Sequence, residues 1–201
     1  MTKFSKIALC ALIIGSSAFF TSCDDTDEKT PPVVEPELTL YQKLGGTTMV
    51  NDPNNPNVKI EQGRLSFRSV VDSTIVLIVS DIVAGNEGNL GAHFAPIAGE
   101  VFGTPPNTTN VAVLSKNLTD FFSANTGGGA TNTYSGLGMV EAHDPAINPR
   151  MGAKSTNADY DRFIGFVGAA AGKNGVTDPA IISEVVAVLE SIRAPIVQDP
   201  S

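Results

Sequence analysis

Several stretches of the chain repeat apolar residues every three or four positions, the spacing that buries one face of a helix. The clearest lies near the C-terminus, where Asp178 is a capping residue, Pro179 takes the first helical position and the apolar repeat continues to Ile192. Pro195 ends this helix, because proline interrupts the hydrogen-bond ladder. The pattern therefore predicts a C-terminal amphipathic helix.

Similar signals predict three helices upstream of it. Thr156 followed by Asp159 has the spacing of a capping box, and the apolar positions that follow extend toward Gly175. Another helix is expected over residues 111–124, before three consecutive glycines, and a short one over residues 136–143.

The stretch 62–83 leaves two structures open. Its apolar residues keep helical spacing, but residues 70–83 contain many β-branched side chains, which also suit a buried strand. Its length favours a helix. Loops rich in proline, asparagine and glycine are expected at residues 51–57, 85–91, 104–110 and 144–157. We therefore expect an all-α domain over residues 40–201.

The N-terminus has the features of an export signal. Two lysines precede the uncharged apolar run 7–20, which is too short to span a membrane comfortably. Ser22 directly before Cys23 resembles the lipobox of bacterial lipoproteins, which implies that residues 1–22 are removed and that Cys23 is lipidated. The alternative is an ordinary secretory signal. The lipobox implies an exported protein that is lipid-anchored to a bacterial membrane, on the periplasmic side or at the cell surface.

Residues 23–39 are acidic and rich in proline, so they are expected to form a flexible, solvated tether. The whole chain carries a formal net charge of −8, and 42% of its residues are apolar. That apolar share is enough for a packed core. The acidic balance argues against a nucleic-acid partner, because phosphate binding requires a surplus of lysine and arginine.

Cysteine and histidine, two common metal-binding residue types, are scarce in this chain. Cys10 and Cys23 are the two cysteines, and both precede the domain, which excludes a multi-cysteine metal site there. His93 and His143 are the two histidines. His143 follows Met139 by four residues and shares its helix face. It either packs against apolar neighbours or serves as the single axial ligand of a haem iron.

A series of motifs occurs in a distinctive order. Tyr134-Ser135-Gly136 precedes Met139, Ala142 and His143, and the earlier motifs are Leu40-Tyr41-Gln42-Lys43-Leu44-Gly45-Gly46, Val70-Val71-Asp72, Phe94, Phe121-Phe122 and Gly127-Gly128. Each motif alone is weak, but their order and spacing resemble the group 1 truncated haemoglobins over most of residues 40–197. The resemblance places Phe94 in a loop and implies a two-over-two helical sandwich that encloses haem b.

By this resemblance His143 is the proximal ligand of the haem iron. The residues implied to contact the cofactor are Phe94, Phe121, Tyr134, Met139, Phe163 and Lys116. Tyr134 and Lys116 are assigned to the propionates, whereas Phe166 is assigned to core packing. His93 is expected to be exposed, with a second role as ligand as the alternative.

The chain departs from the family on the distal side of the expected haem. The positions that usually carry a tyrosine and polar side chains fall on Ile75, Leu114 and Leu118. The resemblance therefore implies an apolar distal pocket and weak retention of oxygen, since a bound ligand of partial negative charge loses a hydrogen-bond donor. A shift of the alignment by one residue brings in a donor from Thr74, Ser115 or Thr119 instead.

Two insertions relative to the family are expected, at residues 47–64 and 144–155. The second follows His143 directly and contains two prolines, so it forms either a wall over the haem edge or a partner surface. Met151 within it is a conceivable haem contact.

Two classes of function follow. The first is a haem protein that binds a diatomic gas, with NO detoxification or peroxidase-like chemistry as extensions. Such turnover needs an external electron donor, because the chain carries no flavin or nicotinamide motif. The second is a haem-poor structural or interaction lipoprotein that retains a globin scaffold.

Overall fold

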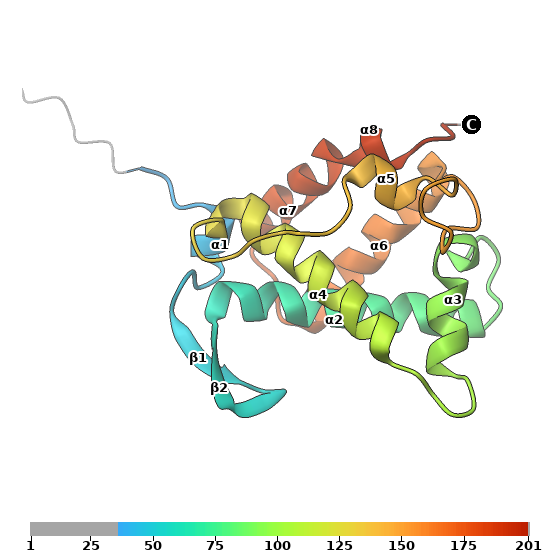
Figure 1. Ribbon diagram of the computed structural model, residues 1–201. Coiled ribbons are helices and arrows are strands. Elements are labelled where there is room, and N and C mark those ends of the chain that lie inside the picture. The colour runs from blue at the N-terminus through green and yellow to red at the C-terminus, as the bar shows by residue number, and fades with distance from the viewer. Residues whose placement is uncertain (1–35, 201) are drawn as a thin grey trace, which may run out of the picture. The chain divides into compact units, whose positions relative to one another are not determined.

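The structure is a computed structural model, and it describes residues 36–200. These residues form a predominantly helical body (Figure 1). Its helices are α1 (Leu40–Lys43), α2 (Gln62–Val83), α3 (Gly91–Val101), α4 (Thr109–Ser123), α5 (Met139–His143), α6 (Asn157–Lys173), α7 (Pro179–Ser191) and α8 (Arg193–Ile196). Strands β1 (Met49–Asp52) and β2 (Asn55–Glu61) form an antiparallel hairpin, and a π-helical turn, η1 (Ala124–Gly128), follows α4.

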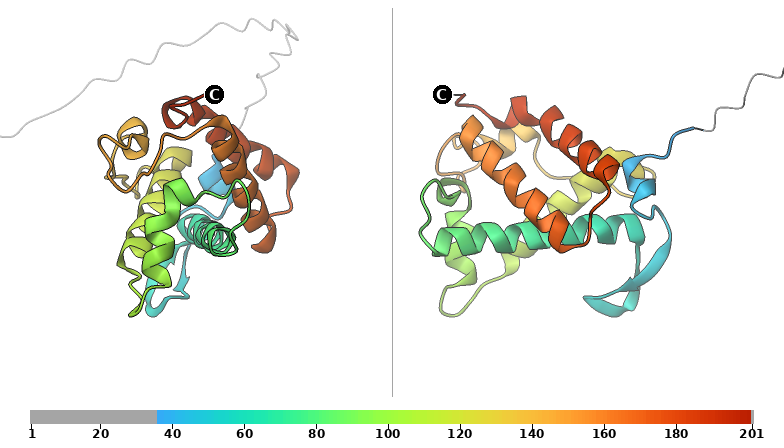
Figure 2. Two further views of the ribbon diagram at one scale, coloured as in Figure 1. Left: turned by 90° about the vertical axis from the view of Figure 1, so that its right-hand side faces the viewer. Right: turned by 180° about the vertical axis from the view of Figure 1, so that it is seen from behind.

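Helix α2 is the centre of this body. It packs against α3 and α4 and also against α6. Viewed along α2, in the left panel of Figure 2, α3 and α4 lie on one side of it and α6 and α7 on the other. Part of the core lies between α2, α3 and α4, where Val71, Ile75 and Ile97 are buried together. A second cluster joins Leu40 and Tyr41 of α1 to Phe67 of α2.

The predicted helical class is confirmed, and so are four long helices. The stretch 62–83 is a single helix, so the strand alternative for it was wrong. The capping box of Thr156 and Asp159 is present, and Asp178 accepts a hydrogen bond from the amide of Ala180 at the start of α7. The helix before His143 is shorter than expected, since it begins at Met139 rather than near residue 136.

The β1–β2 hairpin and α3 were not anticipated, and neither was α8, which contains the Pro195 that was expected to end the last helix. Residues 51–57 were expected to form a loop, and they lie in the β1–β2 hairpin instead. Residues 91–101 form α3, so Phe94 lies in a helix and not in the loop that the resemblance implied. The predicted signal peptide 1–22, the lipidated Cys23 and most of the tether 23–39 fall outside the described residues. Within residues 36–200, no helix combines the length and the apolar character needed to cross a membrane.

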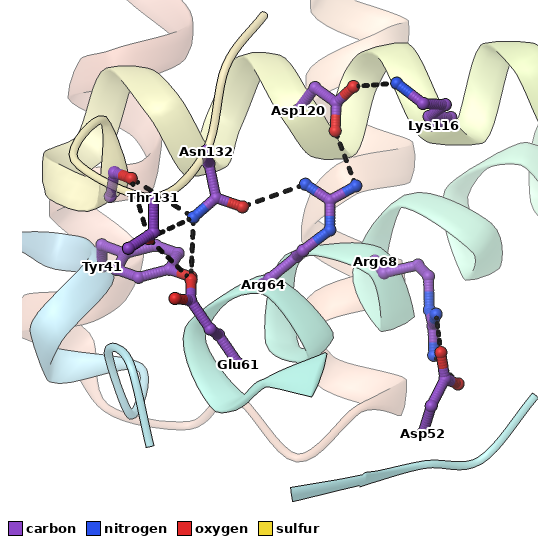
Figure 3. A network of polar contacts seen from close by, with 10 residues as sticks. Tyr41, Asp52, Glu61, Arg64, Arg68, Lys116, Asp120, Thr131 and Asn132 are labelled. Carbon is purple, nitrogen blue, oxygen red and sulfur yellow. Dashed lines mark hydrogen bonds and ion pairs between the residues drawn. The ribbon is translucent and has the colours of Figure 1, made fainter. Parts of the chain in front are cut away.

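A polar network joins α1, α2 and the chain after α4 (Figure 3). The Tyr41 hydroxyl donates to the Glu61 carboxylate, and the Asn132 amide donates to both, over 3.0 and 2.9 Å. Arg64 continues the network, with an ion pair of 2.6 Å to Asp120 and a hydrogen bond of 3.1 Å to the Asn132 carbonyl oxygen. Burial and the bond to Glu61 raise the pKa of Tyr41 to about 12. The network therefore holds α1 against the start of α2 and the C-terminal part of α4.

Stability at high pH should depend on Tyr41. The folded protein holds the phenolic proton more tightly than the unfolded chain, whose pKa is near 10. The free energy of unfolding should therefore fall as pH rises from about 10 to about 12. Replacement of Tyr41 with phenylalanine should cost about 1–3 kcal/mol at neutral pH, because Glu61 and Asn132 lose a buried partner. Urea denaturation from pH 7 to pH 11.5 measures both effects.

In that series the Y41F variant should also lose stability less steeply above pH 10. The remaining alkaline dependence should come in part from Tyr160, whose burial also raises its pKa to about 12. If the free energy of unfolding falls equally steeply above pH 10 in the variant and in the native protein, Tyr41 does not control the loss of stability at high pH.

Candidate ligand cavity

The main functional candidate in the described part of the chain is a cavity of about 320 Å³. Its walls come from α3, α4, α5, α6, α8 and the segment 144–155. Ligand-binding pockets fall in the range of about 300–1,000 Å³, and they combine mostly apolar walls with a few polar groups. Val113 and Leu137 line the cavity and are 50% and 51% exposed, so they border its opening.

Most of the predicted cofactor contacts meet in this cavity. Its lining includes Phe94, Leu114, Leu118, Phe121, Tyr134, Met139, His143 and Phe163. These residues come from four helices and a loop, and they are separated by as many as 69 positions between Phe94 and Phe163. The edge-to-face contact of Phe121 with Tyr134, with ring centroids 5.4 Å apart, makes one aromatic corner of the wall.

Three assignments differ from the sequence analysis. Lys116 does not line the cavity, because its side chain is 62% exposed and pairs with Asp120 one turn later. Ile75 lies in the core between α2 and α3 and is also absent from the lining. Tyr134 lines the cavity, but its hydroxyl donates to the Leu137 carbonyl oxygen over 2.6 Å, so this group is already engaged.

The ring of His143 is oriented by its own helix. Its Nδ1 lies 2.7 Å from the Met139 carbonyl oxygen, an acceptor, so Nδ1 carries the proton and Nε2 carries the lone pair. No hydrogen bond to Nε2 occurs within residues 36–200. Burial lowers the pKa of His143 and therefore favours the neutral imidazole. A neutral ring with one oriented, unpaired nitrogen is the form that binds a metal ion.

Helix α5 is held in place from both ends, although it has only five residues. It packs against α8, and the Gln198 side chain donates to the Val140 carbonyl oxygen over 2.8 Å. After His143, the Asn148 side chain donates to the Ala142 carbonyl oxygen over 2.8 Å. These bonds keep His143 at the cavity wall.

His93 was expected to be exposed, and this was wrong. It is 9% exposed and lines the same cavity as His143. Its Nε2 lies 3.3 Å from the Asp159 carboxylate, and its Nδ1 is buried without a hydrogen-bond partner. Asp159 also accepts hydrogen bonds from Thr156 at the start of α6. The contact between His93 and Asp159 therefore links α3 to the first turn of α6.

The segment 144–155, which was expected to be an insertion, forms a wall of the cavity. Asn148, Arg150, Met151 and Ser155 all line it. The segment is fastened to α3 at two points, by a hydrogen bond of 2.8 Å from the Gly152 amide to the Ala92 carbonyl oxygen and by an ion pair of 3.0 Å from Arg150 to Glu100. A Cβ on Gly152 would lie 2.7 Å from that carbonyl oxygen, so the close approach requires glycine.

The wall formed by α4 is less apolar than predicted. Asn110 and Asn117 line the cavity beside Leu114 and Leu118, and the sequence analysis missed both amides. Helical spacing contained the signal, because positions 110, 114, 117 and 121 share one face of α4. The alternative donors considered from the sequence are not available there. Thr74 bonds to the Val70 carbonyl oxygen, Ser115 donates to Asp72, and Thr119 is buried outside the cavity lining.

A second, smaller cavity of about 60 Å³ adjoins the first. Leu118 and Phe163 line both cavities, so these two side chains separate them. Its other lining residues come mainly from α2, α6 and α7, and nearly all of them are apolar. Empty apolar cavities of this kind bind small apolar molecules.

No cluster of three or more histidine, cysteine, aspartate or glutamate side chains suited to a metal ion occurs in the described part of the chain. Comparison of the sequence with models of known protein families and with curated proteins gives no match.

Proposed function

We propose that this protein is a haem-binding globin of the truncated type that binds a diatomic gas, and that it is exported and anchored by lipid on Cys23. The observation that carries the proposal is His143. Burial favours its neutral form, the Met139 carbonyl oxygen holds the Nδ1 proton, and Nε2 has no hydrogen-bond partner within residues 36–200. The residue lines the large cavity. Histidines that bind metals are typically oriented in this way, by a hydrogen bond from the other ring nitrogen to a carbonyl oxygen or a carboxylate.

The residues present fit haem b. Phe94, Phe121 and Phe163 supply apolar surface for a porphyrin, whose burial is favourable by roughly 25 cal/mol per Å². Arg150 is the basic residue among the lining side chains, and it replaces Lys116 as the candidate partner of a propionate. Bound haem would supply an iron centre that binds a gas reversibly. The pairing of α2 with α4 opposite α6 and α7 is compatible with the two-over-two arrangement.

Titration of the purified protein with haemin is the direct test. The expected result is a Soret band that saturates at one haem per chain, with quenching of tyrosine fluorescence at the same endpoint. Carbon monoxide added after reduction should shift the band and thereby report an accessible iron. A spectrum equal to that of free haemin at all ratios would contradict the proposal. It would favour the alternative function, an interaction lipoprotein on a globin-like scaffold.

A further inference from the structure

We propose that Asn117 is the hydrogen-bond donor to the gas bound in the large cavity, and thus the residue that sets the ligand preference of the site. This inference rests on the proposed function. Asn117 lines the cavity from α4, whereas His143 lines it from α5. The two side chains therefore approach one space from different helices.

The position of Asn117 follows from the faces of α4. Val113, Asn117 and Phe121 are spaced four residues apart, and all three line the cavity. Ser115 lies on another face, where it donates to Asp72 of α2. Asn117 is therefore on the cavity face, one turn from Phe121.

The side chain of Asn117 has no polar partner in the described part of the chain. It makes no hydrogen bond or ion pair within residues 36–200, although it is half-buried. Asn110, the other amide that α4 supplies to this wall, is engaged, since its Nδ2 donates to Glu100 over 2.9 Å. Arg150, the lining cation, is also held by Glu100. An uncommitted amide in a largely apolar cavity retains two N–H donors for a ligand.

Dioxygen at a ferrous haem draws electron density and accepts hydrogen bonds, whereas carbon monoxide accepts them weakly. A bond of this charge-assisted kind changes a dissociation constant by about tenfold or more. Asn117 would therefore favour dioxygen over carbon monoxide. The expectation of weak oxygen retention rested on the apolar side chains of Ile75, Leu114 and Leu118, and Asn117 revises it.

The test uses the haem-loaded protein and its Asn117→Leu and Asn117→Asp variants. Leucine has a similar volume and no donor, and aspartate keeps the shape but loses the N–H groups. Both variants should raise the dioxygen dissociation rate by about tenfold. Both should also raise the infrared C–O stretching frequency of the carbon monoxide complex, while carbon monoxide dissociation changes little.

Asn110→Leu is the matched control, because it removes an amide from the same helix and the same wall. Its C–O stretching frequency should equal that of the native protein. If Asn117→Leu and Asn117→Asp both leave the frequency and the dioxygen rate unchanged, Asn117 is not the donor. That outcome, in variants that keep a native Soret band, overturns this inference alone. The absence of a Soret band in the native protein overturns the proposed function as well.

Discussion

Replacing His143 with alanine is expected to abolish the Soret band while the helical circular dichroism stays unchanged. Changes beside a metal ligand typically cost 10–100-fold in metal affinity, so loss of the ligand itself should cost more. The fold should persist, because the ring is only partly buried and its one hydrogen bond lies within α5. Haemin titration followed by absorbance measures the loss directly.

The second histidine of the cavity supplies the matched control. His93→Gln should retain the Soret band, since the Nδ1 of His93 is enclosed by protein atoms and its Nε2 is engaged by Asp159. A His143→Gly variant should recover the band when free imidazole is added, because the small molecule can occupy the vacated space. If His143→Ala leaves the spectrum unchanged, or if the band is lost in His93→Gln alone, the ligand is His93 and not His143.

The largest loss of stability is expected for Gly127→Ala. Gly127 has a φ of 110°, a backbone conformation that side chains other than glycine rarely adopt. A Cβ there would lie 2.2 Å from Thr39 Oγ1 and 2.4 Å from Thr39 Cβ. Thr39 caps α1, so any movement away from the new methyl group breaks that cap. Strain and loss of the cap together should cost about 3 kcal/mol, measured by urea denaturation.

Two other glycines separate the causes of that loss. Gly85 has a φ of 68° but no atom within 4 Å of the added Cβ, so Gly85→Ala should show the strain alone, about 1 kcal/mol. Gly165 lies inside α6 with open space around it, and Gly165→Ala should stabilise the protein by about 1 kcal/mol. If a second change, Thr39→Gly, restores part of the stability that Gly127→Ala loses, the restored part is due to the contact between the added Cβ and Thr39. Equal losses at Gly85 and Gly127 would show that the contact adds nothing.

The helices with local start signals could be predicted from the sequence. Thr156 with Asp159, and Asp178 with Pro179, satisfy the first amides of a helix by groups a few residues away, so the signal is contained in the sequence itself. Helix α3 lacks such signals, since its capping residue is Leu90 and Pro96 lies inside it. The hairpin was missed because its strands are largely exposed and rich in asparagine, which is typical of loops.

The site was predictable only in part, for a similar reason. Helical spacing and the resemblance located His143, Phe121 and Phe163, which all line the cavity. Lys116 does not line the cavity, and its spacing of four residues from Asp120 already indicated an intrahelical ion pair. Burial of His93 depends on α6, a helix more than 60 positions away in the sequence, so no local pattern revealed it.

The fastening of segment 144–155 has a consequence for how the cavity exchanges its contents. The helices around the cavity are held by buried apolar clusters, whereas the contacts described for this wall are polar. They are one backbone hydrogen bond and a partly exposed ion pair to α3, the bond from Asn148 to α5, and two backbone bonds to Ser155 from residues 198 and 199. Release of the wall therefore needs only a fraction of the global unfolding free energy, and it becomes easier as salt screens Arg150 from Glu100. If the cavity holds a bulky cofactor as proposed, its entry and exit would then require only a local opening, and we expect their rate to rise with ionic strength while the helical scaffold remains folded.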